Sequence, residues 1–243
     1  MMERNSEASP RTLARTAGAF QLLEAIATAC GQVIILGKLV VPYNAAATAA
    51  NILGRPELFW FGFALSVLGV IFHIVYALLY YDLFKPVNRR ISLLAMLVLL
   101  VSTAVQAVTA ILYAAPMVIL NSGSSLSAFT TEQLRALAYA FVRVNSYALD
   151  THIILFGLWC LLTGILIFRS SFMPRVLEVL LMISGLGWLI YLVPPLGVRL
   201  FMPYIAGASA IGEIPVEFWL ILMAVNAERW KQQASIAGAS IGP

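Results

Sequence analysis

Charged side chains are scarce in this sequence of 243 residues. They make up 11% of it, whereas hydrophobic residues make up 61%. A typical soluble domain has about 25% charged residues and about 45–50% apolar ones. Because so few charged side chains cannot give a soluble domain its polar surface, the composition excludes a soluble catalytic module. It predicts a protein that lies in a lipid bilayer.

Cysteine and the motifs of common soluble enzymes are also rare or missing. The two cysteines, Cys30 and Cys160, both fall in apolar runs, where free thiols pack as small apolar groups. The sequence contains no CxxC pair, Walker loop, GxSxG elbow or dinucleotide fingerprint. The pattern therefore favours neither a disulfide framework nor ATP-driven work by this chain alone.

Long apolar runs, separated by short polar breaks, are what the sequence does contain. A helix needs about 20 residues to cross the hydrocarbon core of a bilayer, and six runs are about that long. We therefore predict an all-α fold, a polytopic membrane protein that forms a bundle of six transmembrane helices. The predicted spans are residues 16–40, 58–81, 91–115, 144–168, 176–194 and 203–226.

Prolines and a capping pattern mark several predicted boundaries. The third span either ends at residue 115 or continues past Pro116. Thr130 and Gln133 have the spacing of a capping box, which predicts a short helix outside the bilayer before the fourth span. Pro194 and Pro195 lack the amide hydrogen that a helix interior needs, so we expect the fifth span to end there.

The basic residues predict the orientation, because lysine and arginine are retained on the cytoplasmic side. If the N-terminus is cytoplasmic, ten of the 15 basic residues lie inside and five outside. The ten are Arg4, Arg11, Arg15, Lys85, Arg89, Arg90, Arg169, Arg175, Arg229 and Lys231, and the five are Lys38, Arg55, Arg135, Arg143 and Arg199. We therefore predict a cytoplasmic tail at 1–15, a single transmembrane domain at 16–226 and a second cytoplasmic tail at 227–243.

Three short segments are specific enough to indicate a family. They are KPVNR at 85–89, RSSFMPR at 169–175 and the run from GE to W at 212–230. In order and spacing, the sequence from about residue 10 to 231 resembles a bacterial membrane family known as domain of unknown function 4386. The resemblance implies a multi-pass protein of the bacterial inner membrane with six helices. It implies no established activity.

Six ionisable side chains lie well inside the predicted spans, away from their ends, and near the bilayer centre each such group costs at least about 2.5–3.5 kcal/mol. Such groups are therefore expected to point into the bundle. If each residue adds about 1.5 Å of rise, they form two levels. The outer level holds Asp150, His152 and Glu213, and the inner level holds Glu24, His73 and Glu217. Asp150 points about 200° away from His152 around the fourth helix, so the two do not readily serve one ligand.

The leading hypothesis for function is a binding or transport protein that is linked to protons and has a polar cavity within the membrane. Its candidate site consists of Glu24, His73, His152, Glu213 and Glu217. Glu213 and Glu217 are four residues apart and share one face of the sixth helix. Because two neighbouring carboxylates in a low dielectric do not both stay ionised, this pair is suited to carry a proton. We predict no catalytic residue.

Two other classes of function stay open. One is an intramembrane enzyme that acts on a lipophilic substrate by acid–base or metal chemistry, and the other is a non-catalytic subunit of a membrane complex. The predicted partner is the lipid bilayer, and a small lipophilic ligand, a homo-oligomer and a larger complex are further alternatives. Nucleic acid is excluded, because the basic residues are dispersed over loops and form no stripe.

We predict no cofactor, although two alternatives exist. His73 and His152 raise the idea of a haem between two imidazoles, but their predicted depths differ by about 10 Å. That offset exceeds the roughly 4 Å between two axial nitrogens. Glu24, His73 and Glu217 have ligand types and depths that suit a divalent metal. Each histidine is equally well explained as a packing residue that is hydrogen-bonded to a carbonyl or a neighbouring glutamate.

Overall fold

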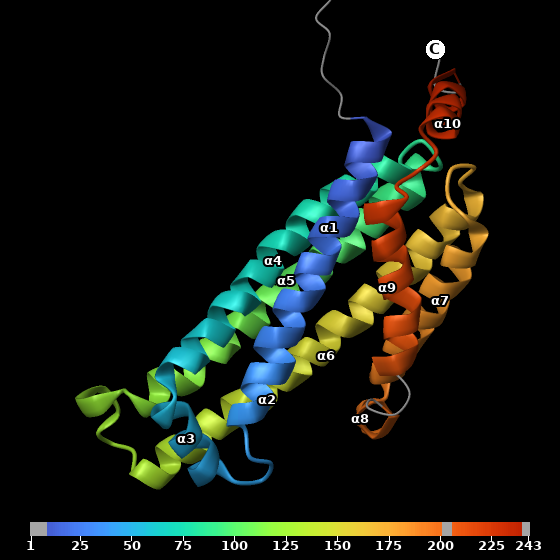
Figure 1. Cartoon of the computed structure of the whole chain (residues 1–243). Helices are drawn as coiled ribbons and strands as arrows, with labels where there is room; N and C mark the ends of the chain where they lie inside the picture. The colour runs from blue at the N-terminus through green and yellow to red at the C-terminus, as the bar shows by residue number, and fades with distance from the viewer. Residues whose placement is uncertain (1–8, 201–205, 240–243) are drawn as a thin grey trace, which may run out of the picture. The chain divides into compact units, whose positions relative to one another are not determined.

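The computed structural model describes residues 9–200 and 206–239, and most of these lie in helices (Figure 1). No strand occurs among the described residues, which confirms the all-α prediction. The α-helices are α1 (Pro10–Thr28), α2 (Leu36–Leu39), α3 (Ala45–Gly54), α4 (Pro56–Phe84), α5 (Arg89–Leu120), α6 (Thr131–Arg169), α7 (Arg175–Leu189), α8 (Pro194–Leu200), α9 (Ala206–Leu222) and α10 (Ala227–Ala239). A π-helix at Ala29–Ile35 joins α1 to α2, and short 3-10 helices lie at Gly123–Leu126 and Ile190–Leu192.

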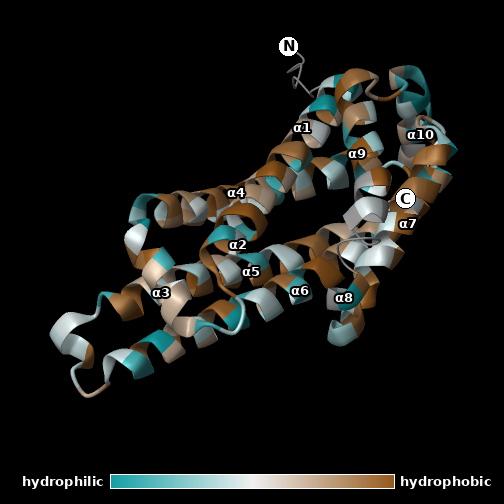
Figure 2. Cartoon of the chain, turned by 60° about the horizontal axis from the view of Figure 1, so that its bottom comes forward, coloured by the Kyte–Doolittle hydropathy of each residue, from teal (hydrophilic) through white to brown (hydrophobic). Residues whose placement is uncertain are grey.

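Five helical segments of the described chain are long and apolar enough to cross a membrane. They are Pro10–Leu39, Pro56–Phe84, Arg89–Leu120, Thr131–Arg169 and Arg175–Leu192. In their most apolar stretches only 28–50% of the residues are buried inside the protein, so many apolar side chains point outward, as expected of helices that contact lipid. Figure 2 shows hydrophobic residues along much of α4, α5, α6 and α7, whereas α10 is largely hydrophilic.

These five segments correspond to the first five predicted spans. The sixth was predicted at 203–226, and its first residues lie outside the described part of the chain. The helix α9 covers 17 residues of it, ending at Leu222. The five apolar segments are thus a property of the structure, while the sixth span stays a prediction.

The capping box at the start of α6 is confirmed. The Thr130 backbone amide donates to Gln133 Oε1 at 2.8 Å, and the Gln133 amide donates to Thr130 Oγ1 at 3.2 Å. The helix that this cap starts is not a separate short one, as was predicted. It is a single helix of 39 residues that continues to Arg169, because no proline or glycine interrupts residues 131–156.

Prolines shape three helices in different ways. Pro116 and Pro215 lie inside α5 and α9, so the third apolar helix does continue past Pro116. The fifth ends earlier than Pro194, since α7 stops at Leu189 and tightens into a 3-10 turn. Val193, with φ −114° and ψ 84°, is not helical, which is the usual restriction on a residue before proline. Pro194 then begins α8, where its fixed φ suits the first turn.

The residues predicted to form one transmembrane domain fall into two compact units. The first unit consists of the described residues of Met1–Leu22, His73–Val101 and Ile153–Pro243, and the second of Leu23–Phe72 and Ser102–His152. The helices α1, α4, α5 and α6 contribute residues to both. The core of the first unit is rich in aromatic rings, among them Tyr76, Tyr80 and Trp159. Phe59 and Tyr113 lie in the core of the second unit, with ring centroids 4.9 Å apart.

Within the first unit, α6 and α7 cross in close contact at two glycines. A Cβ atom built on Gly157 would lie 2.9 Å from the carbonyl oxygen of Gly185, and one built on Gly185 would lie 2.8 Å from that of Gly157. The side chain of Trp188 also comes within 2.8 Å of the Gly157 position. Small residues at a helix crossing allow the backbones to approach closely, so this contact holds α7 against α6.

We expect Gly157→Leu to destabilise the protein by about 1–3 kcal/mol or more, because the added side chain meets backbone atoms that cannot turn away. The measurement is the thermal unfolding midpoint in detergent. Gly37→Leu is the matched control, since nothing lies within 4 Å of that position. Equal midpoints for the two variants would show that the crossing is not closely packed.

Candidate functional site

Glu24 on α1 lies in a hydrogen-bonded cluster inside the second unit. Its side chain is only 6% exposed. Glu24 Oε1 accepts hydrogen bonds from Thr28 Oγ1 at 2.7 Å and from Gln106 Nε2 on α5 at 2.7 Å. Gln106 Nε2 also lies 2.9 Å from Thr28 Oγ1. Charge-assisted hydrogen bonds of this kind stabilise a carboxylate where water is excluded.

His152 on α6 faces Ser102 on α5 in the same unit, and both are buried. Ser102 Oγ lies 2.8 Å from His152 Nδ1 and donates to the His152 carbonyl oxygen at 2.9 Å. His152 Nδ1 also lies 3.2 Å from the Ser102 carbonyl oxygen. A serine hydroxyl has one hydrogen, and here the carbonyl of His152 accepts it. Nδ1 must therefore carry its own hydrogen, so Nε2 is the acceptor nitrogen of the neutral ring.

Glu24 and His152 come together in the second unit. A carboxylate oxygen of Glu24 and a ring nitrogen of His152 lie within 4.8 Å of each other. Their assignment to an inner and an outer level was therefore wrong. The depth estimate counted from a fourth helix that begins at residue 144 and runs straight across the bilayer, whereas α6 begins at Thr131. Asp150, two residues away, is half-buried.

The polar cluster continues past the π-helix. Gln32, within the π-helical segment, donates from Nε2 to Thr109 Oγ1 at 3.2 Å. Asn145 on α6 donates from Nδ2 to the Thr109 carbonyl oxygen at 2.7 Å. Gln32, Thr109 and Asn145 are all buried. Because π-helical segments are rare and often lie at functional sites, this one marks the region around Gln32 as part of the candidate site.

The amides and hydroxyls on α1, on the π-helix and on α5 that surround Glu24 and His152 were not among the predicted site residues. Their spacing was a readable signal, because polar residues three or four apart share a helix face. The residues concerned are Glu24, Thr28 and Gln32 on the first apolar helix, and Ser102, Gln106 and Thr109 on the third. This spacing of hydroxyl and amide side chains was not used, because only ionisable residues were considered as site residues.

The remaining predicted site residues belong to the first unit. His73 on α4 is buried, and its Nε2 lies 2.9 Å from the hydroxyl of Tyr76, one turn further on. The two rings stack with centroids 4.7 Å apart, and Phe156 on α6 approaches His73 edge-on at 6.3 Å. This environment agrees with the interpretation of His73 as a packing residue. The His73 ring is also a group that can accept a proton in the core of the first unit.

Glu213 and Glu217 lie on successive turns of α9, with Pro215 between them. Glu213 Oε1 accepts hydrogen bonds from Ser184 Oγ and Trp188 Nε1, both on α7. Glu217 is buried at 1% exposure, and α1 passes close to it, because a Cβ on Gly18 would lie 3.0 Å from the Glu217 carbonyl oxygen. Glu213 therefore ties α9 to α7.

Within the second unit, the structure thus brings together the predicted site residues Glu24 and His152. The metal set of Glu24, His73 and Glu217 is divided between the two units and stays a prediction, as does the haem alternative with His73 and His152. A catalytic zinc site usually has three protein ligands, so a metal at Glu24 and His152 needs a further ligand. The pair by itself is suited to acid–base chemistry.

The comparisons with known proteins give a family and no activity. The sequence model of the family described as "Domain of unknown function (DUF4386)" matches residues 16–224, which is most of the chain. No curated protein and no solved structure matches the chain.

We expect the neutral ring of His152 to carry its hydrogen on Nδ1. The measurement is the ¹⁵N spectrum of histidine-labelled protein, and it is simplified by the presence of only two histidines. The His73→Gln variant leaves His152 as the single labelled ring, and Ser102→Ala should then change its tautomer balance. A spectrum in which Nε2 carries the hydrogen would contradict the hydrogen-bond assignment at Ser102.

Proposed function

The chain belongs to the DUF4386 family, and we propose that it is a six-span protein of the bacterial inner membrane that binds and exchanges a proton at Glu24 and His152. The observation that carries this proposal is the buried pair itself. A carboxylate and an imidazole lie within 4.8 Å of each other in a unit built from apolar helices. Residues of this kind inside a membrane helix are costly and are usually functional.

The chemistry of the pair suits proton exchange. The acceptor nitrogen of a neutral histidine and a carboxylate oxygen both take a proton, and one proton shared between them gives two states of the site. Thr28 and Gln106 donate to the carboxylate in the ionised state. When the proton is on Glu24, the Thr28 hydroxyl can rotate, because a hydroxyl group can either donate a hydrogen bond to the carboxyl group or accept one from it. The site therefore accommodates both states without a change of the helix backbone.

In the proposed function, the binding of a proton at this pair is coupled to the binding of a small ligand. Gln106, Gln32 and Asn145 add amide groups that hydrogen-bond in either direction, and all three are buried. Amides and hydroxyls of this kind also hold membrane helices together by hydrogen bonds, but packing alone does not require an ionisable carboxylate among them. The cluster supports a role in binding a proton together with a polar or lipophilic molecule.

The distribution of basic residues supports the proposed topology. Of the ten basic residues predicted to be cytoplasmic, all but Arg4 are described, and these nine belong to the first unit. Four of the five predicted to be outside, Lys38, Arg55, Arg135 and Arg143, belong to the second unit. A basic excess of this kind faces the cytoplasm, so both termini are proposed to lie there.

The proton proposal predicts that the Glu24 carboxyl group binds and releases a proton near neutral pH, the range in which an exchange site has to work. The measurement is infrared difference spectroscopy of the protein in detergent, which detects the carbonyl band of a protonated carboxyl group. Glu24→Gln should remove one titrating band, and His152→Gln should shift the pH at which it appears. Glu57→Gln is the matched control, because Glu57 is an exposed acid in the first turn of α4. A spectrum in which Glu24→Gln changes no more than the control would rule out the proposal.

The topology predicts opposite accessibility for two exposed serines. In a background with Cys30→Ala and Cys160→Ala, a cysteine introduced at Ser125 should react with an impermeant maleimide added to intact cells. A cysteine introduced at Ser235 on α10 should react only after the membrane is opened. Both positions are exposed, so burial does not explain a difference. Labelling of Ser235→Cys in intact cells would contradict a cytoplasmic C-terminus.

A further inference from the structure

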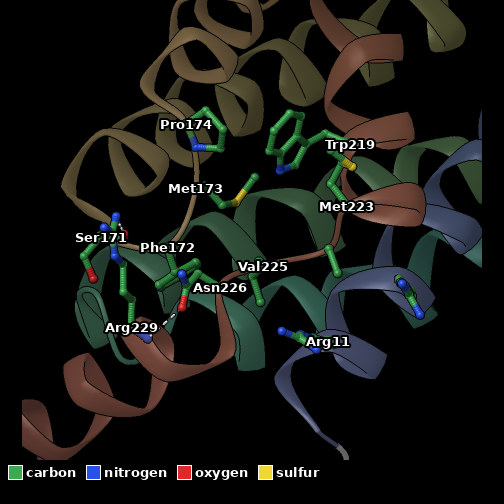
Figure 3. Close-up of a pocket in the computed structure, with 12 residues that line it drawn as sticks. Arg11, Ser171, Phe172, Met173, Pro174, Trp219, Met223, Val225, Asn226 and Arg229 are labelled. Atoms are coloured by element: carbon green, nitrogen blue, oxygen red, sulfur yellow. Dashed lines mark hydrogen bonds between the residues drawn. The ribbon is translucent and has the colours of Figure 1, made fainter.

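A cavity of about 490 Å³ lies at one end of the first unit. It is formed where α1 begins, where α6 turns into α7 and where α9 turns into α10 (Figure 3). All of its lining residues belong to the first unit. They come from three segments that are far apart in the sequence, so the cavity is a product of the fold.

One side of the cavity is cationic. Arg11 and Arg15 lie four residues apart on α1 and so share one face of it, and Arg229 faces the cavity from α10. No carboxylate is among the described lining residues, and the acid next to Arg229, Glu228, does not line the cavity. No described acidic group forms a salt bridge with any of the three guanidinium groups. Three positive charges therefore face a space that lacks a negative partner among the described residues.

The other side of the cavity is apolar. It is lined by Met173 and Trp219, and by Met223, which is 64% exposed at the end of α9. Figure 3 shows the Trp219 ring and the two methionine side chains on the opposite side from Arg11 and Arg229. Tryptophan is enriched at the level of lipid headgroups. A ligand that fits both sides has an anionic group and a hydrophobic part.

The cationic side is held in place by the turns beside it. The backbone at Ala224 adopts a left-handed conformation with φ 58°, which ends α9 and redirects the chain. The Asn226 amide then donates to the Phe172 carbonyl oxygen at 3.3 Å. Arg229 Nη1 donates to the Ser171 carbonyl oxygen at 3.3 Å. The guanidinium group of Arg229 is thus positioned by the turn between α6 and α7.

We propose that this cavity binds the phosphate group of an anionic phospholipid, with Arg11, Arg15 and Arg229 around the phosphate and the acyl chains along Trp219 and Met223. Guanidinium groups recognise phosphate oxygens through paired hydrogen bonds. Basic pockets between membrane helices bind lipid headgroups in this way. Neither Glu24 nor His152 lines this cavity, so lipid binding here and proton exchange there can fail independently.

The shape of the cavity favours a lipid over free phosphate, although both offer the same anionic group. A volume of about 490 Å³ is in the range of sites for whole small molecules, about 300–1,000 Å³. Inorganic phosphate would leave the apolar side uncovered. A phospholipid fills both sides, and its headgroup reaches the cavity from the membrane in which the apolar helices lie.

The test is the thermal unfolding midpoint of the full chain in a zwitterionic detergent, titrated with phosphatidylglycerol. A ligand that binds the folded state raises the midpoint in proportion to its occupancy. We expect phosphatidylglycerol to raise it and phosphatidylcholine at the same mole fraction to leave it unchanged. In Arg11→Gln/Arg15→Gln, the apparent affinity for phosphatidylglycerol should fall about thirtyfold.

Two sets of variants separate a defined site from general attraction to an anionic surface. Arg89→Gln/Arg90→Gln removes the same charge from exposed residues of the first unit that do not line the cavity, and it should keep the wild-type affinity. Met223→Glu should weaken binding more than Met223→Gln does, because both remove an apolar contact with the acyl chains and only the glutamate adds a negative charge beside the phosphate. Equal losses in the two double-arginine variants would overturn the proposal.

Inorganic phosphate distinguishes the two sources of the anionic group. If millimolar phosphate raises the midpoint through Arg11 and Arg15 and phosphatidylglycerol adds nothing, the lipid assignment is wrong and the occupant is a free anion. If phosphatidylglycerol alone raises the midpoint, and Arg229→Gln reduces this effect, the lipid assignment holds. Absence of any shift with either probe would also overturn the proposal.

Discussion

A buried carboxylate in an apolar helix must be given hydrogen bonds by the protein, because its apolar surroundings supply none. In the second unit this requirement falls on Glu24, and Thr28 and Gln106 meet it. The bond to Gln106 joins α1 to α5, so it fixes the rotation of both helices about their axes. The position of Ser102, one turn before Gln106, follows from that rotation. Ser102 in turn orients the ring of His152.

The first unit meets the same requirement differently. Glu213 receives its hydrogen bonds from Ser184 and Trp188, both on the neighbouring helix α7. The rest of this unit is held by aromatic rings and by close contacts at glycine, such as that between Gly157 and Gly185. In the second unit, hydrogen bonds between buried polar side chains thus join the helices, while much of the first unit is held by close packing.

The sequence predicted the helical class and the first five apolar helices well, because long apolar runs have few other interpretations. It also predicted the cap at Thr130, where two side chains only three residues apart decide the outcome. It did not predict that Glu24 and His152 meet. That contact depends on where α6 begins and on how α1 and α5 are rotated, and the apolar residues between the polar ones specify neither. The length of α6 was missed because its polar first turns look like a loop, although nothing interrupts the helix before Gly157.

The left-handed backbone at Ala224 has a consequence for how tightly a ligand is bound. Glycine would adopt this conformation without strain, but it would also give the turn many alternative shapes. Alanine costs roughly 1–2 kcal/mol in the left-handed region, and its methyl group is almost completely buried here. The turn is therefore preorganised. It holds the backbone that precedes Arg229 in one conformation before a ligand binds. Less ordering entropy is then lost when an anionic ligand binds beside this turn than a glycine at the same position would allow.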